Sequence, residues 1–266
     1  MKQISHDRPL VIKVGGRFFE ELQESESGAN VLLNTLAILH KKGRPIVIVH
    51  GGGVQVLDRL TKLGFTSERK NGLRVTPDEH MPIVTSVLAG ELNKRLVAQF
   101  ASVGVNAVGI SLADGDIAKC TEHPDNIGAV GEVHAKSSVL IDTLLSNNML
   151  TVVASIGKDD NGRLYNVNAD HAAICIASLL QTGLYFFADV EGVLDANKNN
   201  IAELNASNAQ QLIANGVITD GMIVKVQAAL FAANKIKQSV TIAACKHASN
   251  ILLEDKLIGT KILSRQ

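Results

Sequence analysis

Short apolar runs rich in β-branched residues alternate along the chain with longer segments whose apolar positions recur at helical spacing. This alternation predicts a mostly parallel sheet with helices on both faces, an open three-layer α/β/α sandwich. We expect strands at residues 10–14, 45–50, 107–110, 151–155, 184–188 and 240–243. We expect helices at residues 31–41, 54–63, 78–102, 139–147, 169–181, 209–215 and 222–234.

The regular pattern is interrupted at residues 113–136, where Gly, Asp and His are frequent and where turns and short hairpins are expected. A second turn is expected at residues 159–162. Asn168 and Ser207 are suited to cap the helices that follow them. No internal repeat or low-complexity linker is present, so we expect two lobes, residues 1–165 and 166–266, that share one continuous sheet.

Composition narrows the class of protein. The 266 residues are 46% hydrophobic but only 3% aromatic, so aliphatic side chains must fill the core. Lysines and arginines number 26, as do aspartates and glutamates, and this balance weakens a nucleic-acid-binding interpretation. The three cysteines form no CxxC pair, which favours a reduced, cytoplasmic compartment. We expect no signal peptide and no membrane helix, because no apolar run approaches about 20 residues.

Two predicted strands end in glycine. Lys13 is followed after one residue by Gly15 and Gly16, and His50 is followed by three glycines, of which Gly52 and Gly53 open a helix. Glycine lets backbone N–H groups approach an anion closely, and a helix N-terminus adds donors. One such loop is more often only a tight turn, but two at the carboxyl edge of one sheet favour a phosphate or carboxylate site.

Other common sites are absent from the sequence. The chain contains no GxxxxGK[ST], no GxGxxG after these strands, and no HRD or DFG motif. His50, His171 and His247 lack the spacing of a zinc site, and we assign His50 no catalysis.

Four further residues are candidates with an ordinary alternative. Arg74, in a segment with Gly72 and Pro77, could bind a carboxylate or be an exposed turn residue. Asp170 could orient a lysine or only stabilise the first turn of its helix. Asp189, at a strand end, suits a nucleotide or a turn, and Lys225, near a helix N-terminus, suits an anion or solvent.

As an ordered set, these segments resemble the amino acid kinase family. The matching segments are Lys13-Val-Gly-Gly, His50-Gly-Gly-Gly, Asn166-Val-Asn-Ala-Asp170, Asp189-Val-Glu-Gly-Val-Leu and Gly221-Met-Ile-Val-Lys225. Asn71-Gly-Leu-Arg74-Val-Thr is similar to the branch of the family that acts on N-acetyl-L-glutamate, and so are residues 87–94 and 218–225. The resemblance extends from about residue 10 to the final Gly259-Thr260-Lys-Ile.

The resemblance implies that the γ-phosphoryl group of ATP moves to the side-chain carboxylate of N-acetyl-L-glutamate, in arginine biosynthesis. It implies an N-terminal lobe for the amino acid and dimerisation, and a C-terminal lobe for ATP. By similarity, Lys13 and Lys225 flank the transferred group and Asp170 holds both lysines. The expected substrate-binding residues are Gly52, Gly53, Arg74 and Asn166. The expected nucleotide-binding residues are Gly15, Gly16, Asp189, Val190, Glu191, Gly192, Val193, Leu194, Val217, Ile218 and Thr219.

No protein metal ligand is expected, because Mg²⁺ would be held mainly by the nucleotide phosphates. Arginine-inhibited hexameric members carry a helix before the first strand. Only Met1 to Pro9 precede that strand here, so we expect a homodimer that arginine does not inhibit. Carbamate kinase, aspartokinase, glutamate 5-kinase and uridylate kinase remain alternatives, as does a catalytically silent amino-acid sensor. Residues 71–74 disfavour the other kinases, and Lys13, Asp170 and Lys225 together disfavour the sensor.

Overall fold

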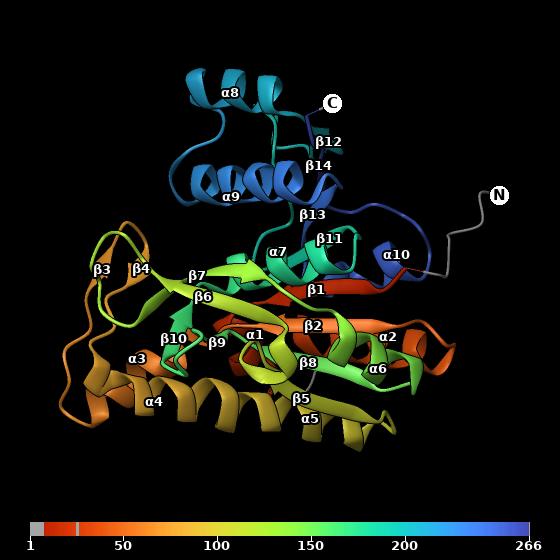
Figure 1. Cartoon of the computed structure of the whole chain (residues 1–266). Coiled ribbons are helices and arrows are strands. Elements are labelled where there is room, and N and C mark those ends of the chain that lie inside the picture. The colour runs from red at the N-terminus through yellow and green to blue at the C-terminus, as the bar shows by residue number, and fades with distance from the viewer. Residues whose placement is uncertain (1–7, 25–26, 266) are drawn as a thin grey trace.

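The computed structural model describes residues 8–24 and 27–265 and contains an eight-stranded sheet between two layers of helices (Figure 1). The strand order is β12 (Glu203–Leu204), β14 (Thr260–Ile262), β13 (Val240–Ala244), β11 (Leu184–Ala188), β1 (Leu10–Val14), β2 (Ile46–His50), β8 (Leu150–Ala154) and β5 (Ala107–Ser111). Every neighbouring pair is parallel except β13 and β14. The expected α/β/α sandwich is therefore confirmed. Most of the segment before the first strand, on which the expected arginine insensitivity depends, lies outside the described residues.

The central strands are uninterrupted apolar runs because both faces of the sheet are covered. Val11 and Val47 pack in the hydrophobic cluster on one face, and Ile12 and Ile48 pack in the cluster on the other. Lys13 is the exception in β1 and is only partly buried. It lies near the carboxyl end of the strand, where a parallel sheet of this kind binds ligands.

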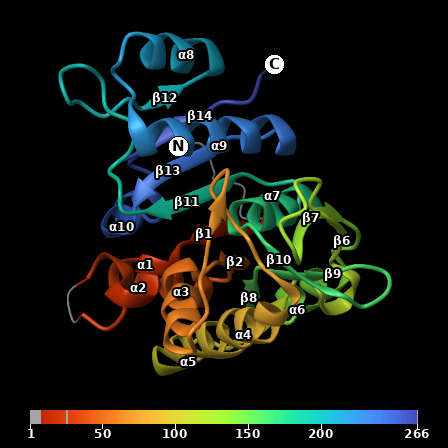
Figure 2. The same cartoon turned by 90° about the vertical axis from the view of Figure 1, so that its left-hand side faces the viewer.

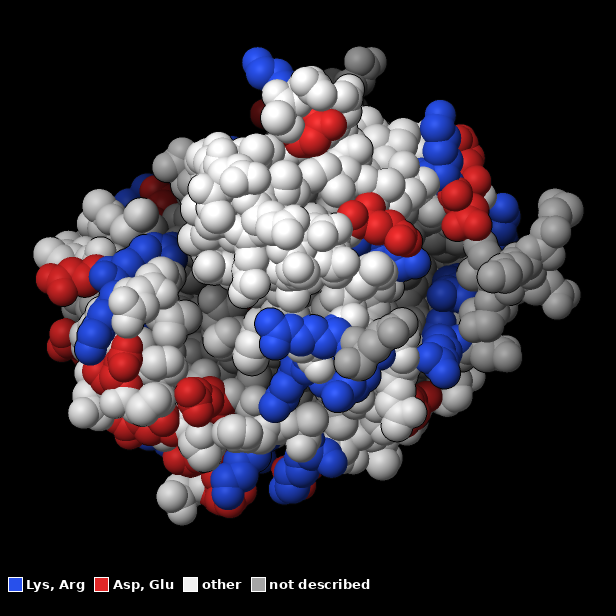
Figure 3. Space-filling view, turned by 90° about the horizontal axis from the view of Figure 1, so that it is seen from above, with Lys and Arg blue, Asp and Glu red and all other residues white. Residues whose placement is uncertain are grey.

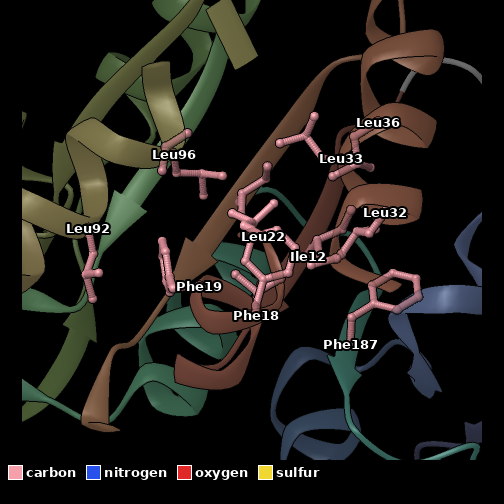
Figure 4. Close-up of a cluster of buried hydrophobic side chains, with 14 of the residues drawn as sticks. Ile12, Phe18, Phe19, Leu22, Leu32, Leu33, Leu36, Leu92, Leu96 and Phe187 are labelled. Carbon is pink, nitrogen blue, oxygen red and sulfur yellow. The ribbon is translucent and has the colours of Figure 1, made fainter. Parts of the chain in front are cut away.

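Most helices of the N-terminal half cover one face, and α7 lies on the other (Figure 2). Figure 4 shows part of the first cluster, with Phe18, Phe19, Leu22, Leu32, Leu92 and Leu96 among its labelled members. The first layer contains α1 (Gly16–Glu21), α2 (Gly28–Lys41), α3 (Gly53–Lys62), α4 (Met81–Thr85), α5 (Asn93–Ser102) and α10 (Ala248–Leu252). The second contains α6 (Val139–Ser146), α7 (Ala169–Leu179), α8 (Ala206–Ala214) and α9 (Asp220–Ile236). Short 3₁₀ turns occupy η3 (Asp114–Asp116) and η4 (Cys245–His247).

The interrupted middle of the sequence folds into a second, four-stranded sheet. Its order is β6 (Ala118–Glu122), β7 (Val130–Ala135), β10 (Leu164–Val167) and β9 (Ile156–Lys158). The expected hairpins at residues 113–136 are represented by antiparallel β6 and β7, and the expected turn at 159–162 joins β9 to β10. A separate two-stranded hairpin consists of β3 (Arg69–Lys70) and β4 (Leu73–Arg74). Asn71 and Gly72 form its turn with φ values of 52° and 81°, the backbone that an Asn-Gly turn favours.

The long helix expected at residues 78–102 is not uniform. It consists of a 3₁₀ turn η1 (Asp78–His80), then α4, then a π-helical segment η2 (Ser86–Leu92), then α5. A π turn places one more residue in a turn than an α-helix does, and it commonly marks a functional site. Apolar periodicity over 25 residues does not reveal such a local change, so the single-helix prediction was wrong in this respect.

The two predicted helix caps had different outcomes. The side chain of Asn168 accepts hydrogen bonds from the backbone N–H groups of Asp170 and His171, as predicted. The prediction for Ser207 was wrong, because α8 begins at Ala206 and the side chain of Asn205 accepts from the N–H of Asn208. Helix α8 contains no charged residue. Figure 3, seen from above the view of Figure 1, shows a broad area without Lys, Arg, Asp or Glu.

The two halves of the chain occupy separate halves of the continuous sheet. Strands β1, β2, β8 and β5 lie together, and β11 to β14 continue the sheet beyond β1. Helix α7, just after the expected boundary at residues 165 and 166, contacts β1 and β2 as well as β11. Within the described ranges, no helix combines the length and the apolar character that crossing a membrane requires.

Candidate active site

Both glycine loops lie at the carboxyl ends of adjacent parallel strands, β1 and β2, as the sequence predicts. The side-chain amide of Gln55, in the first turn of α3, donates a hydrogen bond of 2.9 Å to the carbonyl of Gly16. A Cβ at Gly52 would lie 2.2 Å from Leu92 Cδ1, so a larger residue at that position would displace the buried leucine. The first turn of α3 is therefore bonded to the first loop, and the two loops line adjoining pockets that share Gly53.

Lys13 is held by Asp170. Its Nζ atom is 2.8 Å from Asp170 Oδ1, and the two side chains are 20% and 32% exposed. Asp170 is in the first turn of α7, where a carboxylate is favoured, and Asn168 fixes that turn. The pairing joins β1 to α7 and leaves the lysine ammonium beside the Gly15 loop.

Lys225 lines the same pocket as Lys13, together with Gly15 and Gly16. Its Nζ atom is 2.9 Å from Asp189 Oδ1, and Arg17 Nη1 is 2.6 Å from the other oxygen of that carboxylate. The hydrogen bond from Lys225 is the main reason that the pKa of Asp189 is lowered. The expectation that Asp170 holds both lysines is therefore met for Lys13, whereas Asp189 binds Lys225.

A second pocket is lined by Gly51, Gly52, Gly53, Arg74 and Asn166. Arg74 is 8% exposed and is not the exposed turn residue of the alternative interpretation. Its Nη2 donates a 2.6 Å hydrogen bond to the carbonyl of Gly53, and its Nη1 donates to the hydroxyl of Ser67. Burial, and secondarily the nearby Arg69, lower the pKa of this guanidinium.

Asn166 is positioned by a different contact. Its Nδ2 atom donates a 3.0 Å hydrogen bond to the hydroxyl of Thr76. Thr76 lies two residues after the end of β4. Asn166 lines the same pocket as Arg74 and the glycine loop. The four expected substrate-binding residues are thus brought together at one pocket.

Gly53 and Arg69 line both pockets, so the two sites adjoin. Arg69 was missed by the sequence analysis, although a signal was present. An Asn-Gly turn at residues 71–72 predicts a tight hairpin, which places Arg69 directly opposite Arg74. Arg17 was also missed, because nothing in a lone arginine after two glycines identifies the carboxylate that it contacts.

The segment expected to bind nucleotide after Asp189 has mixed surroundings. The carboxylate of Glu191 is bound by Lys246 and His247, and the N–H of buried Val193 donates a 2.7 Å hydrogen bond to Thr260. Of the remaining members, Val190 is partly buried, Gly192 is buried and Leu194 is exposed. Asp189 is the member of this segment that lines the pocket with the two lysines.

The other expected nucleotide segment leads into α9, the helix that carries Lys225. Thr219 is the N-cap residue of this helix and is exposed. Ile218 is 2% exposed and packs in the core, and Val217 is partly buried. These three residues therefore join the core of the C-terminal half to α9, whose Lys225 lines the pocket with Lys13.

No group of three or more His, Cys, Asp or Glu residues within residues 8–24 and 27–265 has the geometry to hold a metal ion. The carboxylates of Asp170 and Asp189 are each bonded to a lysine. The acidic residues that line the two pockets are Glu21 and Asp189, so a divalent ion would find no cluster of carboxylates there.

Comparison with known proteins agrees with this geometry. The sequence model of the amino acid kinase family matches residues 8–244, which include both glycine loops, Arg74, Asp170, Asp189 and Lys225. The chain belongs to the amino acid kinase family. Proteins of this family named acetylglutamate kinase are similar over nearly the full length. That of Colwellia psychrerythraea is 44% identical over 96% of both chains. That of Pasteurella multocida is 45% identical over 96% of this chain and 99% of its own.

Solved structures support the same amino acid kinase fold. A protein of Streptococcus mutans has a TM-score of 0.77 at 27% identity, over 96% of this chain and 98% of its own. Carbamate kinase of Giardia lamblia has a TM-score of 0.64 at 17% identity, over 97% and 99% of the two chains. N-acetylglutamate synthase of Neisseria gonorrhoeae has a TM-score of 0.79 at 21% identity, over 97% of this chain and 60% of its own. The last two likenesses concern the fold alone.

Proposed function

We propose that this kinase transfers the γ-phosphoryl group of ATP to the side-chain carboxylate of N-acetyl-L-glutamate, giving N-acetylglutamyl 5-phosphate in arginine biosynthesis. The observation that carries the proposal is a pair of adjoining pockets. One contains the two lysines, and the other contains Arg74 and Asn166. The relatives named acetylglutamate kinase support the same activity.

The substrate pocket favours an acylated amino acid over a free one. It is lined by the guanidinium groups of Arg69 and Arg74, and none of its lining residues in the described chain is an Asp or Glu. A free α-ammonium group would lie near these cations without a carboxylate partner, whereas an acetamido group is neutral and needs only hydrogen bonds. The α-carboxylate is suited to the Arg74 guanidinium, and Asn166 can bond the amide. A pocket with this charge disfavours aspartokinase and glutamate 5-kinase activities.

The chemical step needs charge stabilisation rather than a general base. The substrate carboxylate is ionised at neutral pH and acts directly as the nucleophile. One of its oxygens bonds to the γ-phosphorus while the bond from that phosphorus to the β-phosphate oxygen breaks, and ADP leaves with the electron pair. Lys13 and Lys225 neutralise the oxygens of the transferred group, as in other phosphoryl transfers. Asp170 fixes the ammonium of Lys13, and the N–H groups of Gly15, Gly16, Gly52 and Gly53 are available to phosphate or carboxylate oxygens.

Kinases of this kind use ATP with a divalent metal, and we propose Mg²⁺ held mainly by the phosphates. The donor set fits this arrangement, because Asp170 and Asp189 are engaged by lysines, no cluster of acidic side chains within the described residues could hold the ion, and Mg²⁺ retains water readily. When bound, the ion neutralises phosphate charge. Asp189 to Leu194 and Val217 to Thr219 are proposed to contact the nucleotide. Residues 1–165 would then form the amino-acid lobe and residues 166–266 the ATP lobe.

We further propose a cytoplasmic homodimer. Strand β5 is at the edge of the large sheet, which supports pairing with a second copy on that side. Sedimentation equilibrium checks the oligomeric state. A monomer or a hexamer in solution would contradict the proposal.

A coupled assay of ADP release tests the activity, with N-acetyl-L-glutamate, L-glutamate, L-aspartate and carbamate as acceptors. We expect kcat/KM for N-acetyl-L-glutamate to exceed that for L-glutamate by at least about 100-fold, the effect of an unpaired buried charge. Equal rates with the free amino acids would refute the argument from the pocket. No ADP release with any acceptor would instead support an amino-acid sensor.

A further inference from the structure

His50 is a buried polar residue to which the proposed reaction gives no role. It ends β2 and directly precedes the three glycines that line the substrate pocket, yet its side chain has no exposed surface. Its ring packs edge-on against the ring of Phe19, with 5.4 Å between the centroids. Burial lowers the pKa of the imidazole to about 4, so the ring is neutral at neutral pH and one of its nitrogens is an acceptor.

The partners of the ring assign its proton. Nδ1 is 2.9 Å from the carbonyl oxygen of Gly51, and Nε2 is 3.2 Å from Nδ2 of Asn93. The same Nδ2 atom faces the carbonyls of Ile110 and Val152, at 3.2 and 3.1 Å, so it is the donor end of the amide. A carbonyl oxygen can only accept, so Nδ1 carries the hydrogen and donates it to Gly51. Nε2 is then the unprotonated nitrogen, and it faces the Asn93 amide, whose two hydrogens are shared among three acceptors.

The bond to Gly51 sets the direction of a backbone donor. In a planar trans peptide the C=O of one residue and the N–H of the next point in opposite directions. Since the ring holds the Gly51 carbonyl on the buried side, the N–H of Gly52 points away from the ring, on the side of the substrate pocket. Both flanking residues lack a Cβ, so this peptide rotates more freely than one between larger residues, and the bond from His50 restrains it.

The π-helical segment completes the support. Leu88 and Leu92 lie in η2, and a Cβ at Gly52 would come within 2.8 and 2.2 Å of their methyl groups. Asn93 follows η2 directly and is fully buried. One stretch of helix thus packs against Gly52 through two leucines and bonds His50 through Asn93, and the π turn sets the register in which both contacts occur.

We propose that Asn93 and His50 are positioning residues that orient the Gly51–Gly52 peptide, so that the N–H of Gly52 faces a carboxylate or phosphoryl oxygen of the reacting pair. Neither side chain touches substrate. The identity of that oxygen rests on the proposed function, whereas the orientation of the peptide does not.

Two substitutions separate the nitrogens of His50. In His50→Asn the amide nitrogen can occupy roughly the place of Nδ1 and keep the donor to Gly51. In His50→Gln the amide lies near the place of Nε2, and the donor to Gly51 is lost. We expect His50→Gln to raise KM for N-acetyl-L-glutamate or lower kcat by at least about tenfold, a fraction of the effect of deleting one oxyanion donor. We expect His50→Asn to recover most of that loss, and KM for ATP to change by less than about threefold in both variants.

The buried His40 of α2, remote from both pockets, provides a matched control. His40→Gln should lower the melting temperature but leave both KM values unchanged. Equal kinetics for His50→Asn and His50→Gln would overturn the proposal, because a packing role does not distinguish the two nitrogens. If the wild-type chain fails to phosphorylate N-acetyl-L-glutamate, the proposed function fails. An NMR measurement that needs no substrate still tests the orientation of the Gly51–Gly52 peptide.

The wild-type protein itself gives a readout that requires no variant to fold. In ¹⁵N NMR of ring-labelled protein, Nδ1 of His50 should resonate as a protonated nitrogen and Nε2 as an unprotonated acceptor. Asn93→Ala should shift the amide signal of Gly52 more than it shifts that of Gly64, a glycine in an open turn. A ring protonated on Nε2, or a Gly52 signal that Asn93→Ala leaves in place, would refute the proposed orientation.

Discussion

The two adjoining pockets hold their cationic side chains in different ways. In the substrate pocket Arg74 is 8% exposed and donates to neutral acceptors, the carbonyl of Gly53 and the hydroxyl of Ser67. The other pocket, lined by Lys13, Gly15, Gly16, Asp189 and Lys225, is called the phosphate pocket below. In it the side chain of Lys225 is 37% exposed and that of Arg17 is 69% exposed. Both of these cations bind a carboxylate, that of Asp189.

This difference indicates two modes of ligand binding. A guanidinium bonded to neutral groups keeps its net positive charge for the ligand, so the substrate pocket is preorganised for an anion. In the phosphate pocket, incoming phosphates compete with a protein carboxylate for the cations. Substitutions in the substrate pocket should therefore alter KM for the amino acid, and substitutions in the phosphate pocket should alter turnover, KM for ATP and salt dependence.

Removal of either lysine should give the largest effect. We expect Lys13→Ala and Lys225→Ala each to lower kcat by about 10²–10³-fold or more, because each removes a preorganised charge donor from the transferring group. Steady-state kinetics with saturating ATP and N-acetyl-L-glutamate measure this change. Lys62→Ala, which removes an exposed lysine of α3, serves as control and should be without effect. Normal turnover in Lys13→Ala would falsify the assigned role.

Arg74→Ala comes next and acts on the other pocket. Loss of a charged hydrogen-bond donor to the substrate should raise KM for N-acetyl-L-glutamate by about 10–100-fold, the equivalent of roughly 1.5–3 kcal/mol. KM for ATP should change little, because Arg74 does not line the phosphate pocket. Arg59→Ala, at an exposed ion pair, is the control. An equal increase in both KM values would show that the pockets are not separate in the way that the geometry indicates.

Much of the site could be predicted from the sequence because it is encoded locally. A buried strand followed by glycine places Lys13 and the glycine loops at the carboxyl edge of the sheet whatever the remote contacts are. The cap at Asn168 is also local, and it positions Asp170. The mostly parallel sheet followed from the alternation of short apolar runs with helical periodicity.

The remainder depends on contacts between distant segments. The partner of Lys225 depends on the relative placement of β11 and α9, and no local pattern distinguishes Asp189 from Asp170. Arg69 reaches both pockets through the register of a two-residue strand. The π turn before Asn93 changes the register of a helix by one residue without altering its composition. These features depend on tertiary packing, which apolar periodicity does not specify.

Arg17→Gln should have a smaller effect, on KM for ATP, and the effect should depend on the salt concentration. The exposed guanidinium lines the phosphate pocket, and we expect its loss to raise KM for ATP about two- to fivefold at low salt, as for an exposed charge pair. The difference should shrink in about 0.5 M salt, where screening acts over a few ångströms. Arg59→Gln provides a control of similar chemistry outside the pocket. A salt-independent change would point to packing rather than charge.

Asp189→Asn should give the smallest effect, and its sign with pH is defined. Because the Lys225 ammonium lowers the pKa of Asp189 in the folded state, the carboxylate stabilises the fold above the ordinary pKa of Asp, about 3.9. That contribution is lost as the pH falls through the lowered pKa. The side chain is 36% exposed and screened by solvent, so we expect the difference in free energy of unfolding to be no more than about 1 kcal/mol at neutral pH.

Urea unfolding of wild type and Asp189→Asn at about pH 7 and about pH 3 measures this difference, which should narrow at the lower pH. The same substitution in a Lys225→Met background should lose most of its pH dependence, because the main cause of the pKa shift has been removed. A difference that widens on acidification would mean that the carboxylate is destabilised in the folded state. The ion pair between Asp189 and Lys225 would then not stabilise the folded protein.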